Sequence, residues 1–275
     1  MRADGKTILI TGSTDGVGRR VAERLGGMGA RVLVHGRDAV RGEAVVNALR
    51  AAGAEAKFYQ ADLASLAEVR RLADAVRNDH ARLDVLINNA GIGSGGPQAA
   101  RHVSADGHEL LFAVNYLAGF LLTALLTPLL RASAPARIVN VASAGQQPID
   151  FADVMLTRDY SGGRAYRQSK LAQILFTADL AAALKGSGVT VNCLHPATFM
   201  DTTMVRQAGT TPLSTVDDGA DAILNLAVGP EMQGRSGLYF NVLHEARANA
   251  QAYDAAARAK LRELSVMLTG VPAAT

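Results

Sequence analysis

The chain has 275 residues, 49% of them hydrophobic and only 5% aromatic, so it can bury a sizeable core built mainly from Ala, Val and Leu. Its formal net charge of +3 is modest and its basic residues are scattered, which argues against nucleic-acid binding. The single cysteine, Cys193, excludes an internal disulfide and a cysteine-ligated zinc site, and we expect no metal site.

Short apolar runs alternate with longer segments of helical character from the N-terminus onward. The runs expected to form strands are 7–10, 31–35, 56–60, 83–87, 137–142, 189–193 and 237–240. The segments expected to form helices are 12–28 with its opening turn, 38–52, 65–79, 105–132, the segment ending at 184 that holds Tyr166, and 215–228. Asp38 and Ser65 are the expected N-caps of the second and third helices.

This alternation predicts the fold class. It indicates an α/β, single-domain Rossmann fold: a doubly wound, parallel seven-stranded sheet in the order 3-2-1-4-5-6-7, with helices on both faces. No linker or break in composition divides residues 1–275, so we expect one domain. Within it we expect a mobile lid at residues 198–215 and an added C-terminal amphipathic helix at residues 246–268.

The sequence carries no sign of a membrane or export segment. The N-terminus is polar and runs straight into the first strand, so no signal peptide is expected. The longest apolar stretch, residues 116–130, contains two threonines and Pro128 and is shorter than a membrane-spanning helix, so we interpret it as a buried helix. We therefore expect a cytoplasmic protein without a membrane span.

A glycine-rich turn, Thr11-Gly-Ser-Thr-Asp-Gly-Val-Gly18, follows the first expected strand and opens the first helix. Glycines there allow a tight turn and a close approach to a pyrophosphate resting on the helix N-terminus. The spacing differs from G-x-G-x-x-G, and a turn without a nucleotide is the alternative. The strand–turn–helix context favours a dinucleotide site.

The end of the second strand bears on the choice between NAD and NADP. It reads His35-Gly-Arg-Asp38, so no acid stands where the ribose 2′-hydroxyl would be held, and Arg37 follows. Arg19 is a possible helper. We therefore predict NADP(H); the alternative is that Asp38 turns inward and Arg37 is merely solvated.

Tyr166 and Lys170 are four residues apart, which places both on one face of a helix. A neighbouring ammonium favours the phenolate and so lowers the pKa of the tyrosine. Ser143, at the end of the fifth strand, could converge with the phenol on one substrate oxygen, or could simply cap a turn. Asn115 lies inside an apolar helix, where it would be costly unless hydrogen-bonded.

Taken in order, the glycine-rich turn, Asn88-Asn-Ala-Gly91, Asn115, Ser143 and the Tyr166/Lys170 pair resemble the short-chain dehydrogenase/reductase family. Residues 165–180, Asn192-Cys-Leu-His-Pro196 and the wide spacing from Ser143 to Tyr166 resemble its retinol-dehydrogenase-like branch. The resemblance covers almost the whole chain.

The resemblance implies a role for each catalytic residue. Tyr166 would exchange a proton with the substrate oxygen, which Ser143 would hold. Lys170 would lower the pKa of Tyr166 and bind the nicotinamide ribose. Asn115 would kink its helix and, through a water, link Lys170 to solvent. The cofactor-binding residues so implied are Gly12, Ser13, Thr14, Asp15, Gly16, Val17, Gly18, Arg37, Asp62, Leu63, Asn89, Ala90, Gly91, Tyr166, Lys170, Pro196 and Thr198. For Asp62, a turn before Leu63 is the alternative to an adenine contact.

One departure concerns Pro196-Ala197, where the family usually has Pro-Gly. Alanine allows fewer backbone conformations than glycine, which puts the placement of the nicotinamide or the mobility of this loop in doubt. The leading hypothesis is an NADP(H)-dependent carbonyl reductase or alcohol dehydrogenase. The alternatives are a non-catalytic NADP(H)-binding sensor or scaffold, and a sugar-nucleotide epimerase or dehydratase.

Substrate contacts are expected from the loops beyond the carboxyl ends of the strands, at residues 93–96, 146–153 and 198–215. Their apolar residues indicate a hydrophobic ketone, aldehyde or alcohol. The family commonly pairs subunits through the helices that hold Asn115 and Tyr166. We therefore expect a homodimer; the alternative is a monomer in which the terminal helix covers that face.

Overall fold

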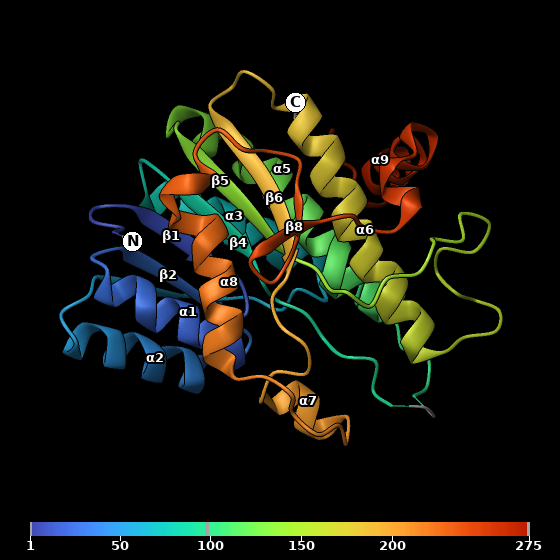
Figure 1. Ribbon diagram of the computed structural model, residues 1–275, viewed down its shortest axis with the longest axis horizontal. Helices are drawn as coiled ribbons and strands as arrows, with labels where there is room; N and C mark the ends of the chain where they lie inside the picture. Colours follow the sequence, from blue (N-terminus) through green and yellow to red (C-terminus); the bar gives the residue numbers. More distant parts are fainter. Residues whose placement is uncertain (1, 97–98, 274–275) are drawn as a thin grey trace.

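A computed structural model describes residues 2–96 and 99–273. Its strands form one sheet in the order β3-β2-β1-β4-β5-β6-β7-β8, with helices on both faces (Figure 1). The strands are β1 (Thr7–Ile10), β2 (Arg31–Gly36), β3 (Ala56–Gln60), β4 (Val85–Asn88), β5 (Ala136–Val141), β6 (Val189–His195), β7 (Tyr239–Asn241) and β8 (His244–Ala246). The predicted Rossmann fold is confirmed.

Two cores lie on opposite faces of the sheet. Helices α1 (Gly16–Gly27), α2 (Ala39–Ala51) and α8 (Val216–Val228) bury Val21, Val45 and Ile223 on one face. Helices α3 (Leu66–Asp79), α5 (Ala118–Ala132) and α6 (Gly162–Ala183) cover the other. Asp38 and Ser65 cap α2 and α3 by accepting from the N–H groups of Arg41 and Glu68, as predicted.

The strand β8 corrects the predicted count of seven. It pairs antiparallel with β7 at the sheet edge, whereas all other neighbouring strands are parallel. Val242 turns the chain with a positive φ of 55°. The strand itself, His244–Ala246, is short and polar, and its side chains are exposed or half-buried. Such a segment lacks the alternating apolar pattern by which strands are recognised.

The long helix predicted at 105–132 begins at Leu110 instead. The Ser104 hydroxyl accepts from the N–H groups of Asp106 and His108, and Gly107 has a φ of 81°, so residues 104–108 form a turn. The helix starts as α4 (Leu110–Phe112), widens into a π-helical segment, η1 (Ala113–Leu117), and continues as α5. Asn115 lies at the centre of the widened turn.

The continuous helical segment Leu110–Ala132 is longer than the apolar run seen in the sequence. Its 23 residues, with a mean hydropathy of 2.0 over the most apolar window, would by length and composition suffice to cross a membrane. Within the fold, 72% of that window is buried. The same segment therefore also meets the description of a core helix.

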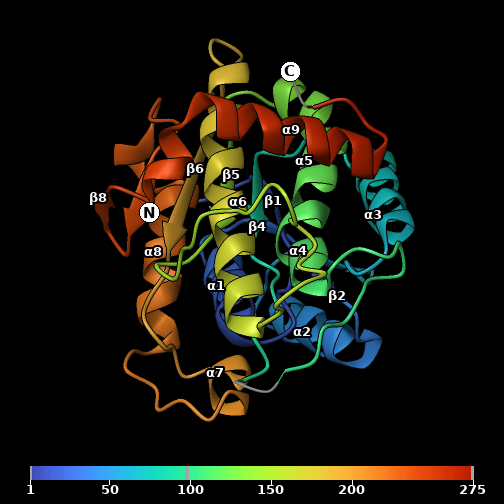
Figure 2. The ribbon, with the colours of Figure 1, turned by 90° about the vertical axis from the view of Figure 1, so that its right-hand side faces the viewer.

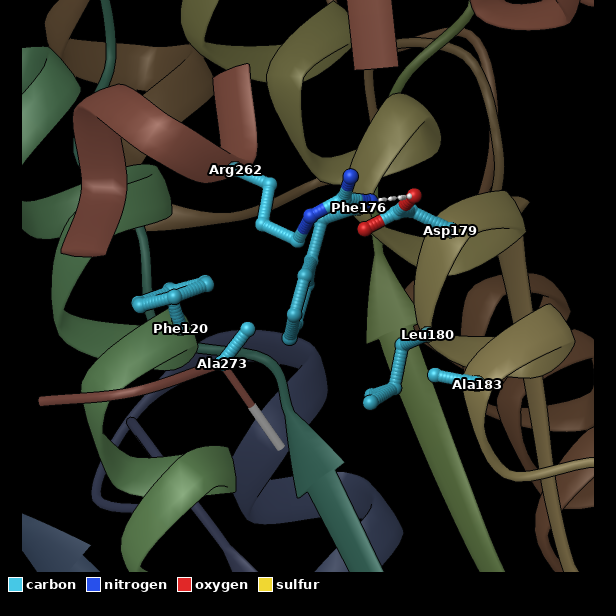
Figure 3. Close-up of a pocket in the computed structure, with 7 residues that line it drawn as sticks. All are labelled: Phe120, Phe176, Asp179, Leu180, Ala183, Arg262 and Ala273. Carbon is cyan, nitrogen blue, oxygen red and sulfur yellow. Dashed lines mark hydrogen bonds and ion pairs between the residues drawn. The ribbon is translucent and has the colours of Figure 1, made fainter. Parts of the chain in front are cut away.

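The predicted C-terminal helix at 246–268 is partly wrong, because Ala246 is the last residue of β8 and the 3-10 turn η3 (Ala250–Tyr253) precedes the helix. Helix α9 (Ala255–Thr269) follows and crosses α5 and α6 (Figure 2). Tyr116 and Ser265 share a hydrogen bond of 2.7 Å, and Arg262 pairs with Asp179. Beneath this crossing lies a pocket of about 150 Å³ (Figure 3), beside the last turns of α6 and away from Tyr166 and Lys170.

The segment 198–215, predicted as a lid, contains the short helix α7 (Thr203–Gln207). All of its residues are described, and none of them is buried. A second short turn, η2 (Pro230–Met232), joins α8 to the edge of the sheet. The lid segment thus lies on the surface, below the carboxyl ends of the strands in the view of Figure 1.

Candidate active site

The glycine-rich loop lies between β1 and α1 and leaves no room for larger residues. Gly12 has a φ of 65°, and a Cβ on it would lie 2.8 Å from the Ala90 Cα. A Cβ on Gly18 would lie 2.2 Å from the Gly12 carbonyl oxygen. The side chain of Asp15 caps α1 by accepting from the Gly16 N–H. The result is a tight turn at a helix N-terminus, which fits a dinucleotide pyrophosphate.

The loop after β4 is hydrogen-bonded to this turn. The Asn89 amide donates to the carbonyl oxygens of Thr11 and Gly12, at 2.9 and 3.0 Å. The Thr11 hydroxyl accepts from the N–H groups of Asn89 and Ala90, both at 3.0 Å. The two predicted cofactor motifs, the glycine-rich turn and the loop after β4, are therefore held together by hydrogen bonds.

His35, on β2, supports the glycine-rich turn. It is 2% exposed, and its Nδ1 accepts from the Gly12 N–H at 3.1 Å. Ser13 accepts from the His35 N–H at 3.0 Å and donates to the Ile10 carbonyl oxygen. Burial lowers the pKa of His35 to about 4, so the neutral ring is the form that holds Gly12. The sequence placed His35 at the nucleotide end of β2 but gave no sign of this support.

Arg37 is exposed at the end of β2, next to Gly36, whose missing side chain leaves space that Thr14 fills. Within the described part of the chain, no ion pair engages the Arg37 guanidinium, whereas the predicted helper Arg19 pairs with Glu23 at 2.9 Å. Asp38 is occupied as the cap of α2.

Two predicted cofactor residues have structural partners. The Asp62 carboxylate accepts from the Ala64 N–H at 3.0 Å, which is the turn that was the alternative to an adenine contact. Leu63 is 6% exposed and packs in the hydrophobic core. Its side chain therefore contributes packing at this position.

Ser143 and Tyr166 lie side by side beyond the end of β5. A Cβ placed on Gly145 would lie 3.5 Å from the Ser143 Oγ and 3.9 Å from the Tyr166 Cε1. Ser143 Oγ also accepts from the Gly145 N–H at 3.0 Å, so the serine forms the turn that was considered as its alternative role. The turn holds the hydroxyl beside the phenol.

The expected lowering of the Tyr166 pKa by Lys170 is wrong for this arrangement. Burial raises the pKa of Tyr166, and only the interaction with Ser143 opposes that rise. The Lys170 Nζ lies over the Tyr166 ring, 5.7 Å from its centroid, and its hydrogen-bond partners are other groups. Burial of the phenol, which disfavours the charged phenolate, therefore sets the direction of the shift.

Lys170 is 5% exposed and has two oxygen partners. Its Nζ donates to the Val141 carbonyl oxygen at 2.9 Å and to the Gln173 Oε1 at 3.1 Å. Burial lowers the pKa of Lys170 to about 8. Gln173 was not identified from the sequence, although its position three residues along α6 put it on the same helix face.

Asn115 is 2% exposed and fully hydrogen-bonded. Its Oδ1 accepts from the Ile92 N–H at 2.8 Å, and its Nδ2 donates to the Ile92 carbonyl oxygen and to Ser169 Oγ. A Cβ on Gly91 would lie 3.3 Å from Asn115 Oδ1 and 3.4 Å from Lys170 Nζ. The π-helical segment thus places the amide beside Lys170, and Gly91 leaves space between them.

Comparisons with known proteins agree with this arrangement. A family model described as short chain dehydrogenase matches residues 6–212. This chain belongs to the short-chain dehydrogenase family. Retinol dehydrogenase 14 of Homo sapiens is 38% identical over 297 residues, which cover 97% of this chain and 87% of that protein. The chain therefore lies in the retinol-dehydrogenase-like branch of the family.

Solved structures carry the same fold. A putative uncharacterized protein from Mycobacterium paratuberculosis has a TM-score of 0.83 at 30% identity, covering 98% of this chain and 96% of its own. A short chain dehydrogenase from Burkholderia cenocepacia, solved with NADP, has a TM-score of 0.72 at 30% identity, covering 88% and 98%. As a member of this family, the chain is an oxidoreductase of the nicotinamide-dependent type.

The short-chain dehydrogenase motif departs from its usual form at Ala197, but the backbone accommodates the change. Ala197 is buried and is not among the non-glycine residues with positive φ; that conformation falls on Phe199, at 44°. The preceding His195 shares a hydrogen bond of 3.1 Å with the Thr198 hydroxyl. Alanine is thus free of backbone strain at this position.

Proposed function

We propose that this protein is an NADP(H)-dependent carbonyl reductase or alcohol dehydrogenase that acts on hydrophobic substrates. The observation that carries the proposal is the convergence of Ser143, Tyr166, Lys170 and Asn115 at the carboxyl ends of β4 and β5. The nicotinamide supplies or accepts the hydride when it is bound. The protein's own residues hold the substrate and move the proton.

In the reductive direction the Tyr166 Oη donates its proton to the carbonyl oxygen, which becomes the hydroxyl of the product. Because burial raises the pKa of Tyr166, the phenol carries the proton to be donated at neutral pH. The Ser143 hydroxyl, beside the phenol, donates a hydrogen bond to the same oxygen and stabilises its developing negative charge. Lys170 adds a positive charge on the side of Asn115 and Gly91.

Apolar side chains beside Tyr166 support the hydrophobic substrate class. Leu111, Leu156 and Ala165 form a small buried cluster, against which Ile92, Tyr160 and Tyr166 pack. The cluster therefore joins the catalytic tyrosine to the segment between Ser143 and α6. Apolar surroundings beside the phenol suit a substrate whose carbonyl carries a hydrocarbon body.

The proposal is tested by NADPH oxidation against a panel of hydrophobic ketones, aldehydes and quinones. Retinaldehyde belongs in the panel because a relative is named for retinol. We expect turnover that falls by about 10² to 10⁴ in Tyr166→Phe, while NADPH binding by fluorescence titration is retained. Equal turnover by the variant would refute the role of Tyr166. NADPH binding without turnover of any substrate by the wild type would favour the sensor or scaffold alternative.

We propose NADP(H) rather than NAD(H) because the Arg37 guanidinium is exposed at the end of β2 and neither His35 nor Gly36 before it supplies a carboxylate. Such a guanidinium suits the 2′-phosphate. We expect Arg37→Ser to raise the KM for NADPH by about tenfold to a hundredfold, since a hydrogen bond to a charged group contributes about 1.5–3 kcal/mol. The KM for NADH is the matched control and should change little. An equal rise for both cofactors would contradict the assignment.

We propose further that the chain is monomeric and lacks a membrane span. Helix α9 lies on the α5 and α6 face through which a homodimer was expected (Figure 2). Most of the apolar window of Leu110–Ala132 is buried within the same fold. Sedimentation velocity tests whether the chain is monomeric. Recovery in the supernatant after ultracentrifugation without detergent tests whether it lacks a membrane span. A dimer of about twice the 28.7 kDa chain mass would contradict the monomeric state.

A further inference from the structure

The carbonyl oxygen of Ser143 accepts two hydrogen bonds that lead away from the catalytic residues. The Gln146 Nε2 donates to it at 3.0 Å, and the Tyr239 hydroxyl donates to it at 3.3 Å. Tyr239 lies on β7, far along the chain, and is 7% exposed. The backbone of the serine is thus fixed independently of the bond that its hydroxyl accepts from Gly145.

Gln146 is itself held by the C-terminal part of the chain. Its Oε1 accepts from the Asn249 N–H at 2.7 Å. Because the same side chain donates to Ser143 through Nε2, the amide connects the backbone at 249 to the backbone at 143. Gln146 was expected among the substrate contacts, but both ends of its amide are occupied by the protein.

A second amide fixes the same loop three residues further on. Gln251 accepts from the Ile149 N–H at 2.7 Å and donates to the Ile149 carbonyl oxygen at 3.1 Å. The side chain therefore pairs with both backbone groups of one residue, as a neighbouring strand would. Ile149 is 4% exposed, so the loop is also anchored by burial at this point.

We propose that Gln146 and Gln251 are positioning residues for Ser143, and that residues 239–253, here called the C-terminal clamp, hold the serine loop beside Tyr166. The inference rests on the proposed function, because it takes Ser143 to bind the substrate oxygen. Ser143 belongs to a loop rather than to a strand or helix. Without the clamp, the serine backbone loses its bonds to Gln146 and Tyr239, and small displacements of a reacting group lower the rate steeply.

The first test replaces Gln146 by Met, which is similar in length and forms neither hydrogen bond. We expect kcat for the best carbonyl substrate to fall at least about tenfold, with the KM for NADPH within about twofold of wild type. Gln251→Met should act in the same direction and less strongly, because it touches the loop farther from Ser143. Lys260→Ala, at an exposed position on α9, is the control and should match wild type.

A double-mutant cycle distinguishes positioning from general stabilisation. In a Ser143→Ala background, Gln146→Met should cost nothing more, because the hydroxyl that it positions is gone. An equal loss in both backgrounds, or no loss of kcat in Gln146→Met, would overturn the inference while leaving the proposed function intact. If Ser143→Ala itself retains full activity, the role of Ser143 in the proposed function fails, and the inference fails with it.

A pair of variants at Asn249 tests the same connection without altering either glutamine. Asn249 has a φ of −52°, which proline can adopt, and its side chain accepts from the Gln251 N–H. Asn249→Ala removes only the side-chain cap. Asn249→Pro also removes the backbone N–H that donates to the Gln146 Oε1. We expect the proline variant to have a kcat several-fold below that of the alanine variant, with equal NADPH affinity. Equal kcat values would show that this N–H does not position the serine.

Discussion

The residues around Lys170 and those of the lid segment, 198–215, both lie toward the carboxyl ends of the strands. They are held in place very differently. Lys170 and Asn115 are buried, and their polar atoms have partners on β5, α6 and the loop after β4. In the lid segment no residue is buried, and its bonds are largely internal, such as those between Asp201 and Arg206. Burial and hydrogen bonds hold the first region in one arrangement. The lid segment has few buried contacts that would restrict its conformation.

Under the proposed function, the difference assigns the chemistry to the first region and the choice of substrate to the second. A proton-transfer site needs groups fixed within fractions of an ångström, which burial and hydrogen bonds provide. A segment held by few buried contacts can change its packing at little cost in free energy. We therefore expect substitutions in the first region to lower kcat, and those lid substitutions that remove a contact with a neighbouring segment to alter KM.

The largest effect in this comparison is expected for Lys170→Met, with a loss of about 10² to 10⁴ in kcat/KM, since it removes the buried positive charge that lies between Gly91 and the Tyr166 ring. Because burial lowers the pKa of Lys170 to about 8, the charge is present below that pH and is lost above it. The wild-type rate of carbonyl reduction should therefore fall as pH rises through about 8, and this limb should be missing in the variant. An unchanged limb would assign it to another group.

The next effect concerns stability and the support beneath the glycine-rich loop. The pKa of His35 is about 4 in the fold, below its ordinary value of 6.5. The unfolded chain therefore takes up a proton between pH 6.5 and 4 that the folded chain does not, so stability falls as pH falls through this window. The loss is on the order of 3 kcal/mol, at about 1.4 kcal/mol per pH unit.

Denaturant unfolding at pH 7, 5 and 4 measures this loss. His35→Asn is the matched variant, because its Oδ1 can accept from the Gly12 N–H in place of Nδ1 but does not titrate. Its stability should fall less between pH 7 and 4 than that of the wild type. Parallel pH profiles for the two proteins would show that His35 is not the titrating group.

Substitutions of Gln173 are expected to have a smaller effect on kcat, and they should shift the pKa of Lys170 in either direction. Its Oε1 accepts from Lys170, and the Thr177 hydroxyl ties the Gln173 backbone to Asn140 on β5. Gln173→Leu removes one of the two partners of the ammonium, so we expect about a tenfold lower kcat and an alkaline limb shifted to lower pH. Gln173→Glu should shift that limb to higher pH, because a carboxylate stabilises the ammonium.

The other titratable groups near Lys170 are Tyr166 and His195, whose pKa is lowered by burial and by the Lys170 charge. Neither side chain is altered in the Gln173 variants, so opposite shifts would report on Lys170 itself. Shifts in the same direction for Leu and Glu would indicate that Gln173 acts by packing alone.

The framework could be predicted from the sequence to a large extent because its signals are local. The first seven strands, the caps at Asp38 and Ser65, and the order of the catalytic motifs depend on periodicity, capping chemistry and spacing along the chain. β8 was missed because its residues are polar and exposed. The π-helical segment at Asn115 was expected only as a kink, since the extra residue in the turn leaves no pattern in the sequence.

The amide contacts could not be predicted, for a physical reason. A glutamine amide both donates and accepts hydrogen bonds, so Gln146, Gln173 and Gln251 pair with any backbone group or ammonium that the tertiary fold brings near. Gln146 and Gln251 bind Asn249 and Ile149, which lie about one hundred residues away in the chain, whereas Gln173 binds Lys170 on the same helix. The pKa of Tyr166 was likewise misjudged because spacing reveals a neighbouring charge but not the burial that outweighs it.

The smallest effect is expected in the lid. Met204 is 39% exposed and faces the loop after β4, where a Cβ on Gly93 would lie 3.0 Å from its Cγ. Met204→Ala removes a contact that is only partly desolvated, so we expect a two- to fivefold rise in substrate KM, about 0.4–1 kcal/mol, with kcat nearly unchanged. Leu213→Ala, at a lid position that is 69% exposed, is the control and should leave both constants unaltered. A hundredfold loss of kcat in Met204→Ala would place the lid with the rigid residues around Lys170, because only a group that fixes the reacting atoms lowers kcat by so much.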